Sequence, residues 1–413
     1  MTVIPQCRFC RTPLTHTFLD LGEQPLSNAY LTLAELQAGG ERAYPLHARV
    51  CDMCFLVQVD DPVAADAIFD ADYAYFSSYS ASWVAHAKRY AEAMTRRLSL
   101  TPTSLVMEIA SNDGYLLQHF VGAGIPVLGI EPTANTARAA LEKGVPTEVM
   151  FFNAATAAGL AARGVAADLI AANNVLAHVP TIGDFVAGFR EVLKPQGVLT
   201  FEFPHLLKLI ELVQFDTIYH EHYSYLSALA VERVLAANGL RAFDVERLTT
   251  HGGSLRLFCC HADAGHLETK SLLALREEES AARLDRIEGY EGFAPRVATV
   301  RDGFLAYLAA AKAAGRKVAA YGAAAKGNTF LNYAGVSDAD IVCVFDANPA
   351  KQGRFLPGSH VPILAPDKIA EVRPDDLLIL PWNLRDEIIG QMGLIRDWGG
   401  RFVTASPEIS ILP

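Results

Sequence analysis

Two stretches of the chain alternate between short apolar runs and segments with helical periodicity. In the first, helices are expected from 116 and over 136–143, between apolar runs that are typical of buried strands. The expected strands are 104–109, 127–130, 147–150, 168–172 and 197–203. Strands that alternate with helices predict a parallel sheet with helices on both faces.

The second stretch follows a region of helices at 266–314. Strands are expected at 317–321, 341–345 and 376–380, with a helix after the first of them. This pattern is similar to half of a Rossmann fold. We therefore expect an α/β protein with three domains, namely 1–84, 85–265 and 266–413.

The N-terminal segment instead carries two Cys-x-x-Cys pairs, Cys7/Cys10 and Cys51/Cys54. Four thiolates suit a tetrahedral zinc ion and leave no open coordination position, so this zinc is expected to be structural. Free thiols and a redox pair are the alternatives. The other three cysteines lie in apolar runs, where a cysteine is most often a small buried hydrophobe.

Composition and charge narrow the class of protein. The 413 residues are 51% hydrophobic and 20% charged, which is typical of globular domains. The net charge of -11 argues against binding nucleic acid or an anionic membrane. The sequence has neither an apolar run of about 18 residues nor a signal-peptide pattern at its start. We expect a soluble cytoplasmic protein.

Acidic and amide side chains gather where the strands of the first α/β stretch end, the edge at which such sheets bind ligands. Glu108, Asp113, Glu131 and the Asn173-Asn174 pair all fall there. Glu131, 23 residues past Glu108, is well placed to accept hydrogen bonds from two ribose hydroxyls. The turn after the first strand lacks the Gly-x-Gly-x-x-Gly motif of a pyrophosphate site. This favours S-adenosylmethionine (SAM), although a sheet that binds another ligand stays open.

The segment 215–227 is rich in groups that can exchange a proton. It contains Asp216, Tyr219, His220, Glu221, His222, Tyr223 and Tyr225, and Ser227 after them is a suitable helix N-cap. A histidine there could serve as a general base and a tyrosine could donate to an enolate oxygen. A metal site or a structural polar loop are the alternatives.

Three further features have a functional and a structural interpretation. The tyrosines and serines of 72–83 either reach a site or pack between domains, and His251 before two glycines is either a site histidine or part of a turn. The small-residue turn at Gly322, with Lys326 and a helix start, suits a diphosphate. Because Asp346 lies 24 residues past Gly322, an NAD site is an alternative.

Taken in order, these motifs resemble the SAM-dependent sugar C-methyltransferases that act on nucleotide-linked 4-keto-deoxysugars. The motifs are the two Cys-x-x-Cys pairs, Tyr-x-Tyr-Phe-Ser-Ser, Glu-Ile-Ala-Ser-Asn-Asp-Gly, Tyr-His-Glu-His-Tyr-Ser-Tyr and His-Gly-Gly-Ser-Leu-Arg. The resemblance implies a central class I SAM-methyltransferase sheet, a small N-terminal zinc module with four cysteine ligands, and a C-terminal Rossmann-like domain that binds the nucleotide sugar. Ala110 and Asn112 stand where many methyltransferases have glycine.

The resemblance also implies roles for individual residues. The expected catalytic residues are His222 (the base), Tyr219, Glu221, Tyr75 and Tyr79. The expected SAM-binding residues are Glu108, Ala110, Asn112, Gly114, Glu131, Asn173, Asn174 and His178. The expected substrate-binding residues are His220, His251, Lys326 and Asn328, and the zinc ligands are Cys7, Cys10, Cys51 and Cys54.

The expected substrate is a nucleotide-linked 4-keto-6-deoxysugar, with dTDP as the first choice of nucleotide. The expected reaction is methylation of a carbon next to its ketone, at C-3 or less favourably at C-5. An NAD-dependent nucleotide-sugar oxidoreductase and a non-catalytic zinc-containing scaffold are the rival interpretations. The expected partner is the small-molecule nucleotide sugar, with no nucleic acid or membrane, and a monomer is the default.

Overall fold

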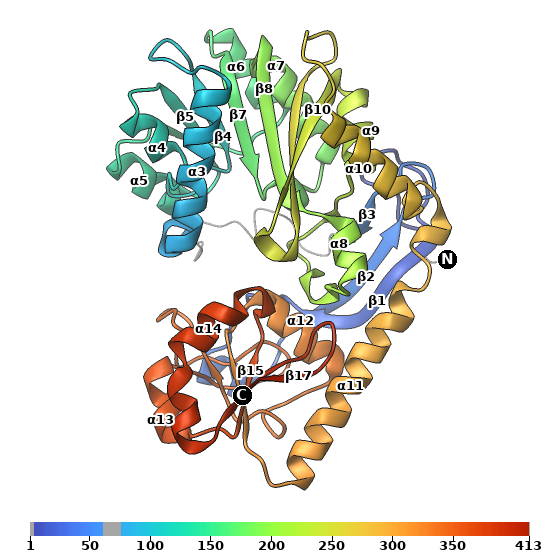
Figure 1. The fold of residues 1–413 in the computed structure, drawn as a ribbon, viewed down its shortest axis with the longest axis vertical. Helices are drawn as coiled ribbons and strands as arrows, with labels where there is room; N and C mark the ends of the chain where they lie inside the picture. Colours follow the sequence, from blue (N-terminus) through green and yellow to red (C-terminus); the bar gives the residue numbers. More distant parts are fainter. Residues whose placement is uncertain (1–3, 61–75, 413) are drawn as a thin grey trace.

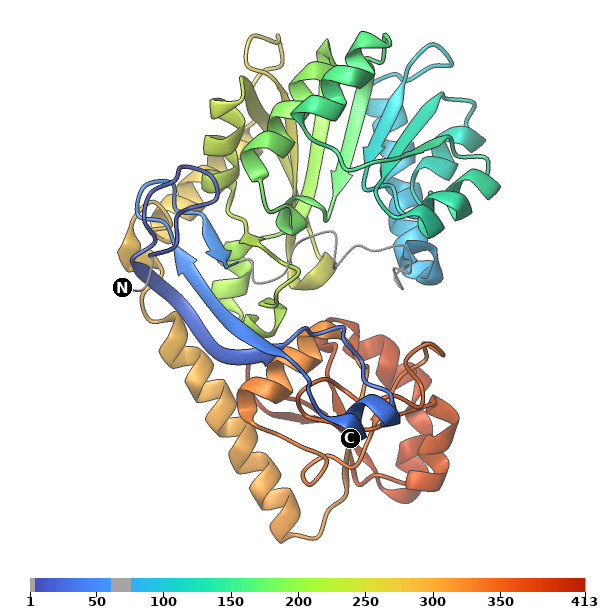
Figure 2. The same ribbon diagram turned by 180° about the vertical axis from the view of Figure 1, so that it is seen from behind.

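The computed structural model describes residues 4–60 and 76–412. Two α/β bodies lie at opposite ends of the molecule (Figure 1). Helix α11 (Phe293–Ala313) and the bent strands β1 (His16–Pro25) and β2 (Ala43–Val50) run along one side and connect them, as the reverse view in Figure 2 also shows. The two α/β bodies therefore lie on either side of a central region.

The larger sheet has seven strands in the order β10-β11-β8-β7-β4-β5-β6. They are β4 (Val106–Ile109), β5 (Val127–Glu131), β6 (Thr147–Val149), β7 (Ala167–Asn173), β8 (Leu193–Pro204), β10 (Leu240–Leu248) and β11 (Ser254–His261). The strands β4 to β8 pair in parallel, whereas β11 is antiparallel to both β8 and β10. The predicted strands are present, but β10 was not predicted.

Helices cover both faces of this sheet, because successive strand residues such as Val106 and Met107 point to opposite faces. Val106 belongs to a core with Tyr90 and Phe120, and Met107 to a core with Phe189. The helices are α3 (Ala81–Arg97), α4 (Leu117–Gly122), α5 (Ala134–Glu142), α6 (Ala154–Ala162), α7 (Ile182–Val192), α8 (Leu206–Glu211), α9 (Ala228–Ala237) and α10 (Lys270–Ala281). Ser227 caps α9 as expected, its side chain accepting from the Ala230 N–H.

The N-terminal segment forms a four-stranded sheet of order β1-β2-β3-β9, with the short helix α1 (Leu33–Ala38) beyond β1. Strand β3 is Val57–Val59, and β9 is Ser224–Tyr225. The acid–base segment thus supplies the last strand of the N-terminal sheet. The sequence pattern did not show the long β1–β2 hairpin, and the predicted domain boundaries stay a prediction.

The C-terminal sheet has six strands in the order β14-β13-β12-β15-β16-β17, parallel except for the last. They are β12 (Val318–Tyr321), β13 (Val344–Phe345), β14 (Ile363–Leu364), β15 (Asp376–Ile379), β16 (Arg401–Thr404) and β17 (Ser410–Leu412), with helices α12 (Ala325–Ala334), α13 (Ile369–Val372) and α14 (Arg385–Gln391). The three strands predicted here are present. Within 4–60 and 76–412, no helix combines the length and apolarity needed to cross a membrane.

Candidate active site

The two Cys-x-x-Cys turns have the same backbone geometry. The residue after each pair, Arg11 or Phe55, has a left-handed backbone with φ of 64° and 58°. Its N–H donates to the carbonyl of the first cysteine of the pair at 3.0 Å in both turns. Each turn therefore points both sulfur atoms of its pair to one side.

The two turns bring four sulfur atoms together. The sulfur atoms of Cys7, Cys10, Cys51 and Cys54 all lie within 4.8 Å of one another. Cys7 and Cys54 are 3.5 Å apart, Cys10 and Cys51 are 3.4 Å apart, and the Gln58 amide donates to the Cys7 sulfur. Four sulfur ligands at these distances fit tetrahedral zinc and leave no position for a substrate.

The edge of the larger sheet that is predicted to bind SAM is formed by the ends of β4, β5 and β7. The turn after β4 has a left-handed backbone at Ala110 (φ 58°), Asn112 (φ 48°) and Gly114 (φ 75°), and Asn174 after β7 has φ 52°. Non-glycine residues in this conformation are strained by about 1–3 kcal/mol and are common at functional sites. A Cβ on Gly114 would lie 3.0 Å from the Val145 side chain, so this turn requires its glycine.

Glu131, at the end of β5, holds the turn in place. Its Oε2 accepts from the Asn112 N–H at 2.8 Å, and its Oε1 accepts from both the N–H and the hydroxyl of Thr133. Oε2 retains a lone pair, so Glu131 can still accept from a ribose hydroxyl.

The same edge carries buried polar atoms without a hydrogen-bond partner in the part of the chain that the structure describes. They are Glu108 Oε2, Asp113 Oδ1, Asn173 Oδ1 and both amide atoms of Asn174. Burial raises the pKa of Glu108 well above its usual range. Buried groups of this kind are normally satisfied, so these atoms are available to a ligand bound at this edge of the sheet.

A short 3-10 turn, Ser77–Tyr79, lies against the cofactor turn. The Ser77 N–H donates to Asn112 Oδ1 at 2.8 Å, and Asp113 pairs with the Ser78 hydroxyl and with Lys143. Tyr79 itself is 79% exposed and stacks on Phe76. The predicted catalytic role of Tyr79 stays a prediction, and Tyr75 lies outside the described residues.

His222 is the centre of the acid–base segment. Its Nδ1 donates to the Thr217 carbonyl at 2.9 Å, which leaves Nε2 without a proton. The Tyr219 hydroxyl lies 2.8 Å from Nε2 and donates to it. We assign this tautomer from the partners of the two nitrogens. The imidazole is thus held with its basic nitrogen next to a phenol.

His178 packs edge-on against His222, with ring centroids 4.7 Å apart. Burial lowers the pKa of His178 to about 4, and burial together with His178 lowers the pKa of His222 well below its usual range. His222 is therefore neutral at pH 7, the form that a general base needs. The sequence predicted that His178 binds SAM, and the structure places it beside His222.

The two neighbours of His222 in the motif point in different directions. Glu221 is partly buried and accepts from the Asn28 amide at 2.6 Å, and burial raises its pKa. His220 is 2% exposed and lies near Tyr44 and the Pro45 carbonyl of β2. His220 contacts the N-terminal sheet, and its predicted contact with substrate stays a prediction.

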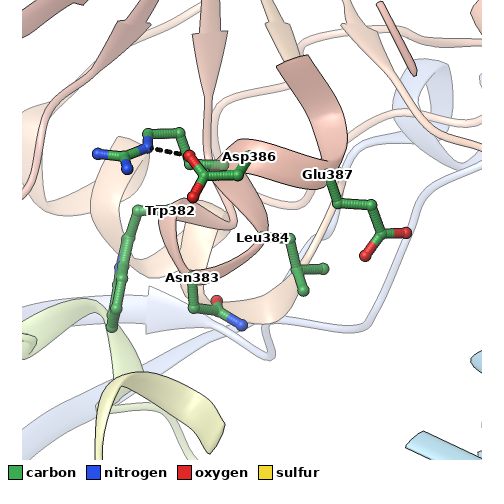
Figure 3. A pocket seen from close by; sticks show the side chains of 6 residues that line it. Trp382, Asn383, Leu384, Asp386 and Glu387 are labelled. Atoms are coloured by element: carbon green, nitrogen blue, oxygen red, sulfur yellow. Dashed lines mark hydrogen bonds and ion pairs between the residues drawn. The ribbon is translucent and has the colours of Figure 1, made fainter. Parts of the chain in front are cut away.

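Trp382 connects the C-terminal domain to the acid–base segment. Its indole N–H donates to Asp216 at 2.7 Å, and Lys326 Nζ lies 4.7 Å from its ring centroid. A Cβ on Gly252 would lie 2.3 Å from the indole, so the glycine after His251 is required by this contact. Figure 3 shows Trp382 beside a hollow of about 340 Å³ lined by residues 382–387.

Two of the predicted substrate residues face this region. Lys326 Nζ donates to Asn383, and His251 is exposed with its ring 5.5 Å from that of Trp83. Burial lowers the pKa of His222, and the nearby charges of His178, His251 and Lys326 lower it further.

The turn at Gly322 does not have the geometry of a diphosphate cradle. The N–H groups of Gly322, Ala323 and Ala324 already donate to Phe345, Asp346 and Gly322 respectively. A Cβ on Gly322 would lie 2.5 Å from Pro381, which closes the crevice between β12 and β15. These three N–H groups are therefore not available to a diphosphate, whereas a diphosphate site at Lys326 and the start of α12 stays a prediction.

Asn328 was also predicted to bind substrate. It is fully buried, and its amide donates to the Ser27 carbonyl at 2.5 Å. Asn328 connects α12 to the N-terminal segment, and its predicted contact with substrate stays a prediction.

Comparison with known proteins covers nearly the whole chain. Family profiles match residues 7–69 (a zinc binding domain), 83–245 (a methyltransferase domain) and 249–407 (a C-methyltransferase C-terminal domain). The chain is 34% identical to C-methyltransferase NovU of Streptomyces niveus over 409 residues, which is 99% of this chain and 97% of NovU. The chain belongs to the C-methyltransferase family.

Solved structures match only the middle of this C-methyltransferase. Magnesium protoporphyrin IX methyltransferase of Synechocystis, with bound SAH, is 16% identical over 43% of this chain and 84% of its own, with a TM-score of 0.34. A SAM-dependent methyltransferase of Clostridium acetobutylicum is 12% identical over 44% and 91%, with a TM-score of 0.35. These scores are too low to support a conclusion.

The family assignment confirms the α/β methyltransferase fold with its zinc module, and confirms SAM and zinc as the cofactors. Sequence reasoning missed Asn28 and Trp382 and gave Asp216 no role of its own. A tryptophan directly after a predicted strand was the only signal for Trp382. Asn28 lies in a segment without a recognised motif, so nothing in the sequence pointed to it.

Proposed function

We propose that this C-methyltransferase acts on a nucleotide-linked 4-keto-6-deoxysugar, with dTDP as the first choice of nucleotide. It methylates the carbon next to the ketone, at C-3 rather than C-5. The observation that carries the proposal is the His222–Tyr219 pair, a neutral imidazole with a bare nitrogen 2.8 Å from a phenol hydroxyl. The class of substrate rests on the sequence motifs and the family.

In this proposal His222 Nε2 removes the proton from the carbon next to the ketone. Nε2 has a single lone pair, which the Tyr219 hydroxyl occupies in the free enzyme, so the bound substrate must displace this hydroxyl before Nε2 can take the proton. The displaced phenol can then donate to the enolate oxygen. A positioned general base is worth about 100- to 10,000-fold in rate, and an oxyanion donor about 100- to 1,000-fold. Methylation at oxygen or nitrogen needs no enolate donor, so the pair favours carbon.

SAM supplies an electrophilic methyl group when it is bound. Glu131 would hold its ribose, and Glu108, Asn173 and Asn174 its polar groups, at the edge of the sheet that adjoins His178. Overall, a C–H bond of the sugar is replaced by a C–CH3 bond, and the proton passes through His222 to water. Lys326 and His251 are the candidates for contact with the anionic nucleotide.

The test separates proton removal from methyl transfer. The protein is incubated in D2O with dTDP-4-keto-6-deoxyglucose and S-adenosylhomocysteine, and exchange at C-3 and C-5 is followed by NMR; a parallel reaction with SAM is followed by mass. We expect exchange and methylation at C-3. His222→Asn should abolish both while SAM still binds by calorimetry.

Tyr219→Phe should slow both reactions, and Tyr333→Phe, in α12 and outside the acid–base segment, is its matched control. If the His222→Asn variant retains exchange, His222 is not the base. If several keto sugars show neither exchange nor a mass gain, the proposed substrate class is wrong.

A further inference from the structure

The N-terminal module contributes a residue to the acid–base segment. Asn28 lies in the connection between β1 and α1, and its amide nitrogen donates to Glu221 Oε1 at 2.6 Å. The two residues are 193 positions apart in the sequence. Asn28 is exposed and Glu221 is partly buried, so the bond lies at the edge of the solvent-accessible site.

The residues on either side of Asn28 are fixed to the C-terminal domain. The Ser27 carbonyl accepts from Asn328, and the Tyr30 hydroxyl donates to the Ala323 carbonyl at 2.6 Å while lying 3.2 Å from Asn28 Oδ1. Because the amide oxygen faces Tyr30, the amide nitrogen faces Glu221. The Asn28 amide is thus oriented before any substrate arrives.

The zinc turns fix the other end of the same hairpin. Val50 of β2 pairs with His16 of β1 and directly precedes Cys51, whereas Asn28 follows the far end of β1. Figure 1 shows the two strands running from the zinc end to the C-terminal domain. The four cysteines and Asn28 therefore lie at opposite ends of the same pair of strands.

We propose that Asn28 is a positioning residue for Glu221, and that the zinc module thereby completes the active site rather than only stabilising its own fold. The proposal rests on the proposed function in giving Glu221 a part in the reaction. A donated N–H favours the ionised carboxylate and fixes its rotamer. The other titratable groups that face Glu221 are Tyr30 and His178.

The Asn28 bond opposes the effect of burial on the pKa of Glu221. Removing this donor should raise the pKa of Glu221, and a carboxylate in its place should raise it further by repulsion. A residue with a merely structural role would lower the amount of active enzyme without moving this titration. The titration therefore distinguishes a positioning role from a structural one.

The experiment uses the full-length, zinc-loaded protein labelled with ¹³C at the glutamate carboxyl carbons. The Glu221 resonance is assigned by its loss in Glu221→Gln and titrated in wild type, Asn28→Ala and Asn28→Asp. The control is Asn238→Ala, whose amide donates to the Val234 carbonyl at the opposite edge of the sheet. The pH dependence of kcat is measured for the same variants.

We expect the Glu221 pKa to rise by roughly one pH unit in Asn28→Ala and by more in Asn28→Asp, with the acidic limb of kcat moving in the same direction. Asn238→Ala should titrate as wild type does. The isosteric Asn28→Asp keeps the test valid if Asn28→Ala does not fold.

Coincident titrations of wild type and the folded Asn28 variants would overturn the proposal. A shifted titration in a protein that methylates no keto sugar would leave Asn28 as the partner of Glu221 and reject only the proposed function. The two failures are therefore distinguishable.

Discussion

Asp216 offers the sharpest test of the energetics of the domain contact. Its side chain is 2% exposed, one oxygen accepts from the Trp382 indole at 2.7 Å, and the other has no partner among residues 4–60 and 76–412. Burial raises the pKa of Asp216 to about 6. Ionisation of the buried carboxylate therefore destabilises the wild-type protein. The Asp216→Asn variant, whose side chain is always neutral, does not undergo this loss of stability.

The sign and size of the effect follow from the linkage between protonation and folding. A pKa of about 6 in the folded protein, against an ordinary value of 3.8, corresponds to about 3 kcal/mol. Because the folded pKa is the higher one, this stability is fully present below pH 3.8 and is lost as the pH rises to about 6. The Asp216→Asn substitution itself changes the free energy of unfolding by an amount that does not depend on pH.

The assay is equilibrium urea unfolding followed by tryptophan fluorescence, at intervals from pH 4 to pH 8. Relative to wild type, Asp216→Asn should gain about 2 kcal/mol between pH 4 and pH 7, since part of the total is already lost below pH 4, and almost nothing further above pH 7. The exposed Asp338→Asn, in the C-terminal domain, is the control and should show no such gain. A difference between Asp216→Asn and wild type that stays constant with pH would refute the reasoning.

Three further predictions concern the cofactors and the domain contact. Cys51→Ser should lose zinc by elemental analysis and melt at a lower temperature, because structural zinc contributes directly to folding; unchanged zinc content would exclude Cys51 as a ligand. Glu131→Gln should weaken SAM binding by about 10-fold in calorimetry, since a charged acceptor on the ribose becomes neutral; unchanged affinity would contradict the ribose contact. Trp382→Phe removes the N–H that Asp216 accepts from and shortens the ring that contacts Gly252, so it should lower stability by at least about 1–3 kcal/mol in the urea assay at pH 7. A variant as stable as wild type would contradict this.

The sequence predicted the features whose signal is local. Four cysteines in two short turns indicate their metal, and the acids and amides that end β4, β5 and β7 indicate a ligand edge because parallel strands finish on the same side. His222 and Tyr219 were found because both lie in one short motif. Their distance, and the tautomer set by Thr217, needed the folded loop.

Burial is what the local sequence pattern could not show. His220 and Asn328 have the residue types of a binding site, but each is buried against the N-terminal segment, which no local pattern could reveal. Gly322 begins a turn that looks suited to phosphate until Asp346 and Phe345 take its N–H groups. Residue type shows which chemistry a side chain can perform, and burial decides whether it is available.

The sequence by itself determined the alternation of strands and helices, the zinc ligands and the types of group at the reaction centre, because each depends on residues close together along the chain. Only the tertiary structure decided which groups meet. Asn28 reaches Glu221, and Trp382 reaches Asp216, through contacts between residues 193 and 166 positions apart. Such contacts arise from the packing of whole domains, and no periodicity or spacing in the sequence records them.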